Sequence, residues 1–142
     1  MKSKTERPYN TELRLQHFRE AVDRQFRKSR RLLSLKQVCA LVATQPAPQF
    51  YITPKQALEK YNLYKQGKDI KADNPRIRQM YMDLFERYEE ARAKLGGGFK
   101  YMIMQDVIDS PAPSFYFSPT SAADYYYRAM EEKRKNNRNK RK

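Results

Sequence analysis

The stretch PAPQFYITP at residues 46–54 returns as PAPSFYFSP at residues 111–119, an offset of 65 residues. The same offset relates Val42 to Val107, Ala57 to Ala122 and Tyr61 to Tyr126. An internal repeat indicates an architecture built from copies of one small unit. The sequence therefore predicts two copies of a module of about 60 residues, each too small to be more than marginally stable alone.

The first copy begins with a helical pattern over residues 11–31, with Asn10 or Thr11 as its N-cap. Apolar residues recur there at steps of four, which places them on one face of a helix: Phe18, Val22 and Phe26. A second helix is predicted to follow Ser34 and to end before Pro46, because the residue before a proline disfavours the helical conformation.

The repeated phrase itself predicts a short extended turn followed by a helix. Residues 50–52 are aromatic or β-branched and favour a strand-like segment. Thr53-Pro54 is a typical helix start, with Thr53 as N-cap and Gln56 at the capping-box position. The third helix is predicted over residues 54–66, where Gly67 ends it.

The second copy follows the same plan. Asn74-Pro75 is predicted to begin a helix that Gly96-Gly97-Gly98 ends, and the next helix covers residues 99–109. Ser118-Pro119 is predicted to open the last helix, whose apolar pattern fades after Met130. Residues 131–142 are highly charged, and the expectation for them is a frayed helix end that passes into a disordered tail.

These patterns predict an all-α fold: two pseudo-symmetric three-helix repeats with short extended Pro-aromatic turns, packed as one unit. The predicted divisions are a basic N-terminal arm (1–10), a basic repeat 1 (11–66), a linker (67–74), a neutral repeat 2 (75–130) and a disordered basic tail (131–142).

The charge of the chain is strongly positive and unevenly spread. Its formal net charge is +14, of which residues 1–44 carry +7 and residues 128–142 carry +6, while residues 76–127 carry −1. Such basicity indicates a polyanionic partner. No apolar run approaches the ~20 residues of a membrane span, and the N-terminus lacks a secretory signal pattern. One cysteine excludes an internal disulfide and fits a reducing, cytoplasmic setting.

The residues that usually carry catalysis are scarce, and the sequence predicts no enzyme, no metal site and no cofactor. His17 is the sole histidine and lies in a helix, and Cys39 lies on an apolar helix face, where cysteine behaves as a small hydrophobe. A metal site needs several convergent ligands. The Gly96-Gly97-Gly98 run lacks the Lys-Ser/Thr of a phosphate-binding loop.

The basic residues of the first helix and of the tail favour nucleic-acid binding, mainly through phosphate contacts. The candidate binding residues are Arg24, Arg27, Lys28, Arg30, Arg31, Lys133, Arg134, Lys135, Arg138, Lys140, Arg141 and Lys142. The break over residues 44–52 is longer than the three to four residues of a helix-turn-helix motif, which disfavours sequence-specific reading. The sequence does not distinguish DNA from RNA as the partner, and it does not indicate the oligomeric state.

The phrase Pro-Ala-Pro-x-Phe-Tyr-x-Ser/Thr-Pro with its following alanine-containing helix resembles small, uncharacterised basic proteins of phages and mobile elements of gut anaerobes. The resemblance covers roughly a third of the chain and implies a phage-type role in genome binding or in a particle. The alternative function is thus a structural or adaptor protein of a larger assembly. It would dock on protein partners through Phe50, Tyr51, Phe115 and Tyr116.

Overall fold

The structure, a computed structural model, describes residues 3–30 and 32–141, and every regular element in these ranges is a helix. The predicted all-α class is confirmed. The elements are α1 (Ser3–Ser29), α2 (Leu35–Val42), α3 (Pro54–Lys65), α4 (Pro75–Lys94), α5 (Lys100–Ile108) and α6 (Ala122–Arg141).

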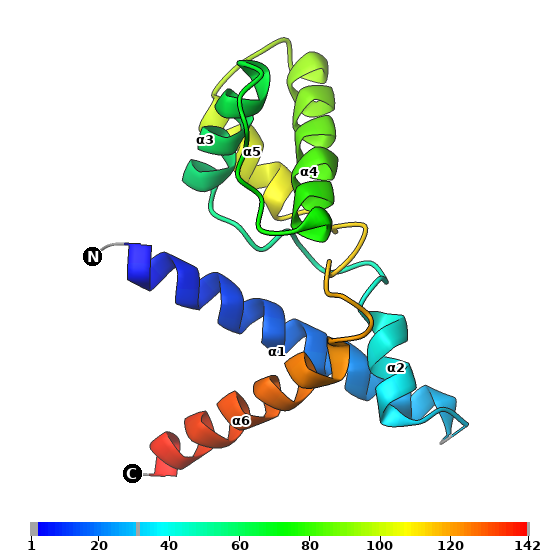
Figure 1. The fold of residues 1–142 in the computed structure, drawn as a ribbon. Coiled ribbons are helices and arrows are strands. Elements are labelled where there is room, and N and C mark those ends of the chain that lie inside the picture. Colours follow the sequence, from blue (N-terminus) through cyan, green and yellow to red (C-terminus); the bar gives the residue numbers. More distant parts are fainter. Residues whose placement is uncertain (1–2, 31, 142) are drawn as a thin grey trace.

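The six helices form two groups that lie one above the other in Figure 1. In one group, α6 packs against both α1 and α2; in the other, α3 packs against α4 and α5. We call these the first lobe (α1, α2, α6) and the second lobe (α3, α4, α5). Each lobe therefore contains two helices from one half of the chain and one helix from the other half.

The two repeated phrases, residues 46–54 and 111–119, are called the Pro-aromatic segments. They cross between the lobes and meet each other there (Figure 1). Ala47 and Ala112 form an isolated antiparallel bridge. The distance from the Ala47 nitrogen to the Ala112 oxygen is 3.0 Å, and that from the Ala112 nitrogen to the Ala47 oxygen is 2.9 Å. The strand-like segment predicted at residues 50–52 does not form, because the Phe50 amide donates to the Ile108 carbonyl at the end of α5 instead of to another strand.

The hydrophobic core runs through both lobes and the segments between them. In the first lobe Phe18 packs edge-on against Phe115 and Phe117, with ring centroids 5.4 and 4.9 Å apart. In the second lobe Tyr61 contacts Phe85 and Tyr88 in the same edge-on manner. Edge-to-face aromatic pairs add about 0.5–1.5 kcal/mol each to the burial of their apolar area.

Helix starts follow the capping signals in the sequence. Ser34 and Thr53 accept hydrogen bonds from the amides of Gln37 and Gln56, whose side chains bond back to complete capping boxes. Asn74 likewise caps α4 through bonds to two backbone amides. Gly67 ends α3 with a positive φ of 72°, which costs glycine little.

Three predicted boundaries differ from the structure. α1 begins at Ser3 rather than near Thr11, so residues 3–10 belong to this helix and are not a separate arm. α6 begins at Ala122 instead of at Ser118, whose hydroxyl bonds to Thr120 rather than capping. It continues to Arg141, so residues 131–141 are helical and not a disordered tail; they are rich in Glu, Lys and Arg, which are good helix formers.

Candidate functional site

The predicted basic cluster occupies the last two turns of α1 and the residue that follows the helix. The side chains of Arg24, Arg27, Lys28 and Arg30 are exposed. Across the described residues none of these four has an ion-pair partner. Arg31, the fifth predicted member, lies outside the described residues. The cluster therefore presents uncompensated positive charge to solvent, which suits contact with a polyanion.

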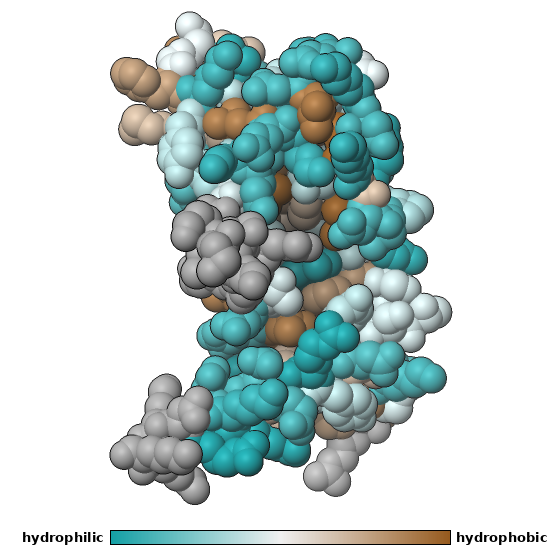
Figure 2. All heavy atoms as spheres, turned by 60° about the vertical axis from the view of Figure 1, so that its left-hand side comes forward, coloured by the Kyte–Doolittle hydropathy of each residue, from teal (hydrophilic) through white to brown (hydrophobic). Residues whose placement is uncertain are grey.

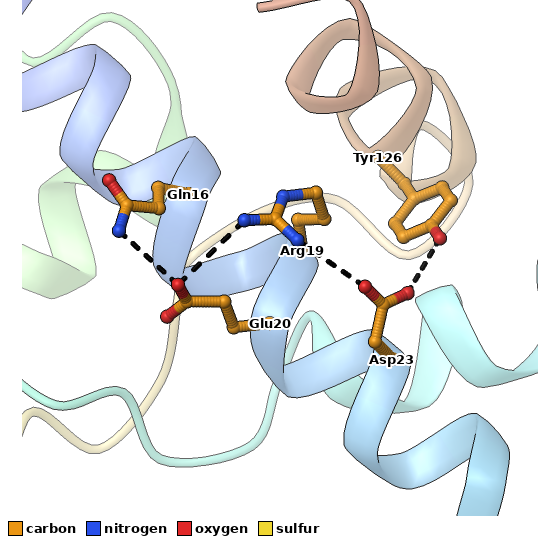
Figure 3. Close-up of polar contacts among 5 residues, drawn as sticks. All are labelled: Gln16, Arg19, Glu20, Asp23 and Tyr126. Carbon is orange, nitrogen blue, oxygen red and sulfur yellow. Dashed lines mark hydrogen bonds and ion pairs between the residues drawn. The ribbon is translucent and has the colours of Figure 1, made fainter. Parts of the chain in front are cut away.

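The acidic residues nearest to this cluster are already bonded within the fold, as Figure 3 shows. Arg19 reaches Glu20 at 3.7 Å and Asp23 at 3.4 Å. The hydroxyl of Tyr126, from α6, donates to the other oxygen of Asp23 at 2.6 Å. Burial and this bond raise the pKa of Tyr126, so it stays protonated as the donor. The network joins α1 to α6 and engages both carboxylates, and neither forms an ion pair with the described residues of the basic cluster.

The predicted basic residues of the tail lie on the last turns of α6. Lys133, Arg134, Lys135 and Arg138 are exposed, and Arg134 pairs with Glu131 at 2.9 Å. An exposed pair at this spacing contributes little stability, so Arg134 remains free to exchange Glu131 for another anion. The side chains of Lys140, Arg141 and Lys142 lie outside the described residues.

The structure does not bring the two basic groups together. Lys133 and Asn137 of α6 line a small cavity with Glu12 and Arg19, in the middle part of α1. The cluster from Arg24 to Arg30 follows toward the C-terminal end of that helix. At 1.5 Å per helical residue, the middle of the stretch of α1 beside Lys133 and Asn137 (residues 12–19) is about 17 Å from the middle of the cluster (residues 24–30), measured along α1.

Both groups nevertheless belong to the first lobe, because α6 packs against α1 and α2. Residues 1–44, which contain α1 and α2, carry a net charge of +7, and residues 119–142, which contain α6, carry +5. The intervening residues 45–118, with the whole second lobe, carry only +2. The packing of α6 thus gathers most of the positive charge of the chain on one lobe.

The Pro-aromatic segments expose only part of what the sequence predicted as a docking surface. Phe50 and Phe115 are each 1% exposed and cannot contact a partner without rearrangement of the core. Tyr51 and Tyr116 are partly exposed. Their hydroxyls are bonded, Tyr51 with His17 at 2.7 Å and Tyr116 to Asp83 at 2.6 Å.

The surroundings of His17 and of Cys39 agree with structural roles for both residues. Burial lowers the pKa of His17 and favours the neutral ring that bonds to Tyr51. Burial raises the pKa of the Cys39 thiol to about 11, which leaves it protonated and unreactive near neutral pH. Within residues 3–30 and 32–141, no three His, Cys, Asp or Glu side chains gather closely enough to hold a metal.

One arginine has a setting that sequence reasoning missed. Arg14 is largely buried, and its Nε and Nη2 donate to the Phe115 carbonyl at 3.1 and 2.7 Å. Its guanidinium carbon lies 3.8 Å from the centre of the Phe117 ring. The one signal in the sequence is its position four residues before Phe18, on the apolar face of the helix.

Comparisons with known proteins leave the family of this chain open. No protein-family model, curated protein or solved structure matches it. In the part of the chain that the structure describes, no helix combines the length and apolar character needed to cross a membrane.

Proposed function

We propose that this protein binds nucleic acid through the first lobe, with most contacts made to backbone phosphates. The observation that carries the proposal is the packing of α6 against α1 and α2, which places segments with net charges of +7 and +5 in one lobe. Phosphate contacts of this kind supply most of the sequence-independent affinity for nucleic acid.

The two basic groups would contact different phosphates of one strand or duplex. A separation of about 17 Å spans several nucleotides, since each strand of B-DNA carries a phosphate about every 3.4 Å along the helix axis. Arg24, Arg27 and Lys28 leave the same side of α1, and Arg24 and Lys28 are one helical turn apart. Such a spacing lets neighbouring side chains reach neighbouring phosphates.

We further infer that the two sequence copies are related by a pseudo-twofold axis near the Ala47–Ala112 bridge. Equivalent positions of two copies can pair with each other only close to a twofold axis. The packing of the third helices supports the same arrangement. α6, from the second copy, packs with α1 and α2, and α3, from the first copy, packs with α4 and α5. Duplication would then have supplied the scaffold, and unequal charge would have reserved nucleic-acid contact for one lobe.

The test compares two charge-removal variants with a matched control. One variant replaces Arg24, Arg27, Lys28 and Arg30 with alanine, and a second replaces Lys133, Arg134, Lys135 and Arg138. The control removes four exposed lysines outside the first lobe: Lys55, Lys68, Lys71 and Lys94. Affinities for a labelled duplex and for a labelled single strand are measured by fluorescence anisotropy between about 50 and 200 mM salt.

Binding to at least one probe should weaken steeply as salt rises. Each first-lobe variant should reduce the slope of log affinity against log salt by about 0.9 for every phosphate that the variant no longer neutralises, whereas the control should leave the slope close to wild type. The proposal fails if neither probe binds near 50 mM salt. It also fails if the control lowers affinity as much as the first-lobe variants, because net charge alone would then explain binding.

A further inference from the structure

A groove lies between the lobes, where α1, the start of α4 and the segment before α6 meet. Its main cavity has a volume of about 770 Å³, and a second cavity of about 200 Å³ adjoins it. The two share four lining residues: Arg14, Asp73, Ile77 and Tyr116. Figure 2 shows apolar surface between the two lobes, framed by hydrophilic side chains. The main cavity is within the size range of sites for small organic ligands.

Arg14 gives the groove a positive charge that the fold does not neutralise. Nε and Nη2 bond to a carbonyl, which carries no net charge, and no described carboxylate lies within ion-pair distance. Burial lowers the pKa of Arg14 to about 10, although the guanidinium remains charged at neutral pH. A largely buried cation without an anion is costly, so an anionic group that enters the groove would relieve this cost. Arg76 also lines the main cavity and is exposed, and it adds a second cation.

Aromatic side chains form the wall next to these cations. Tyr125 stacks on Phe117 with ring centroids 4.2 Å apart, and both line the main cavity. Tyr116 lines both cavities with a φ of 62°, a conformation that is unfavourable for a bulky residue. Bonds from its amide to Ser114 and from its hydroxyl to Asp83 hold it there. Strained residues fixed in this way often belong to binding sites.

The remaining lining groups can form hydrogen bonds. Ser118, Ser121 and Gln79 contribute hydroxyl and amide groups, and Asp73 contributes an exposed carboxylate. The start of α4 is not an anion site in itself, because the side chain of Asn74 already accepts hydrogen bonds from the amides of Arg76 and Ile77. An anion in the groove must therefore be held by the arginine side chains. The carboxylate of Asp73 is suited to accept a hydrogen bond from an N–H group of the same ligand.

Cations, aromatic walls and a hydrogen-bond acceptor side by side match a planar base that carries a phosphate. We propose that this groove binds a nucleotide, with the phosphate at Arg14 and Arg76 and the base against Tyr116 and Tyr125. The nucleotide is either free or the terminal unit of a single strand, since both offer the same chemistry. The site is separate from the basic surface of the first lobe.

The experiment titrates the full-length protein with AMP by isothermal calorimetry, with adenosine and inorganic phosphate as comparisons. A 5′-phosphorylated tetranucleotide tests the strand source: tighter binding of the tetranucleotide assigns the site to a strand end, and equal or weaker binding assigns it to free nucleotide. Arg76→Ala removes an exposed side chain that makes no described hydrogen bond, and it keeps the backbone amide that bonds to Asn74. Arg14→Lys keeps the charge but removes the planar fork, and circular dichroism checks that it folds. Arg78→Ala is the matched control, an exposed arginine two residues from Arg76 that lines neither cavity.

AMP should bind more tightly than adenosine or phosphate. Loss of a charge-assisted hydrogen bond should weaken AMP binding about tenfold or more in Arg76→Ala and Arg14→Lys, and Arg78→Ala should stay within about twofold of wild type. The inference is overturned if neither AMP nor the tetranucleotide binds with a Kd below about 1 mM. It is also overturned if Arg78→Ala weakens binding as much as Arg76→Ala. The first-lobe variants should bind AMP normally, so failure of the salt-dependent duplex binding would leave this result intact.

Discussion

Ala47 and Ala112 occupy the same place in the two sequence copies, and each donates its amide to the carbonyl of the other. Both side chains are 2% exposed, so these two bonds are shielded from water. A shielded backbone bond is expensive to leave unmade. The bridge therefore joins the two Pro-aromatic segments at the point where the chain passes between the lobes.

Replacing Ala47 with proline should destabilise the protein. Proline removes the amide that bonds to Ala112, leaves a buried carbonyl without its partner and adds a ring where only a methyl group fits. The free energy of unfolding should fall by roughly 1–3 kcal/mol. Urea unfolding followed by circular dichroism measures this change. Pro48→Ala, at an exposed neighbouring position, is the control, and an unchanged midpoint for Ala47→Pro would show that the bridge does not stabilise the fold.

The bond between Tyr126 and Asp23 should contribute to the attachment of α6. Tyr126→Phe removes a hydroxyl that is bonded to a carboxylate at 2.6 Å, while Asp23 keeps its contact with Arg19. The expected loss is about 1–2 kcal/mol in the free energy of unfolding. Tyr127→Phe is the matched comparison, because Tyr127 is 57% exposed. Equal stability of the two variants would argue against a role for this bond.

Stability should depend on pH through Glu89. The hydrogen bond from Tyr61 holds the pKa of Glu89 below its ordinary value of 4.5. A carboxyl group with a lowered folded-state pKa stabilises the protein above its ordinary pKa, and this contribution is lost as pH falls through the lowered value. Glu89→Gln should thus show a smaller decrease in unfolding midpoint between pH 7 and about pH 3. Glu90→Gln should keep the wild-type decrease; identical profiles for wild type and Glu89→Gln would contradict the assignment.

Cys39 should resist thiol reagents until the protein unfolds. It is 0% exposed, and burial raises the pKa of its thiol to about 11 from an ordinary value of 9.0. The thiolate fraction at pH 8 is then about a hundredfold lower than in an unperturbed thiol. Reaction with a disulfide reagent should be slow in buffer and fast in concentrated urea. Comparable rates in both conditions would mean that α2 opens readily in the native protein.

Local signals in the sequence predicted local structure well. Thr53 and Asn74 cap their helices because each side chain reaches amides two or three residues ahead. Ser118 has no glutamine or glutamate three residues later, and its predicted helix begins later. The candidate binding residues whose side chains the structure describes are all exposed.

Long-range features could not be predicted from patterns of this kind. Nothing local to Tyr126 indicates that its partner is Asp23, more than 100 residues away. The burial of Arg14 likewise depends on Phe115 and Phe117 from the other sequence copy. Periodicity shows which face of a helix is apolar, but it does not show which helix covers that face.

The packing of α6 against α1 and α2 has a consequence for how the protein folds. Part of the apolar side of α1, including Phe18, is covered by elements from the far end of the chain. During synthesis this surface stays exposed until α6 has emerged from the ribosome. The packing of α1 and α2 in the first lobe can therefore be completed only after nearly the whole chain has been made. This packing then depends on contacts distant in sequence, which makes folding slow for a helical protein of this size.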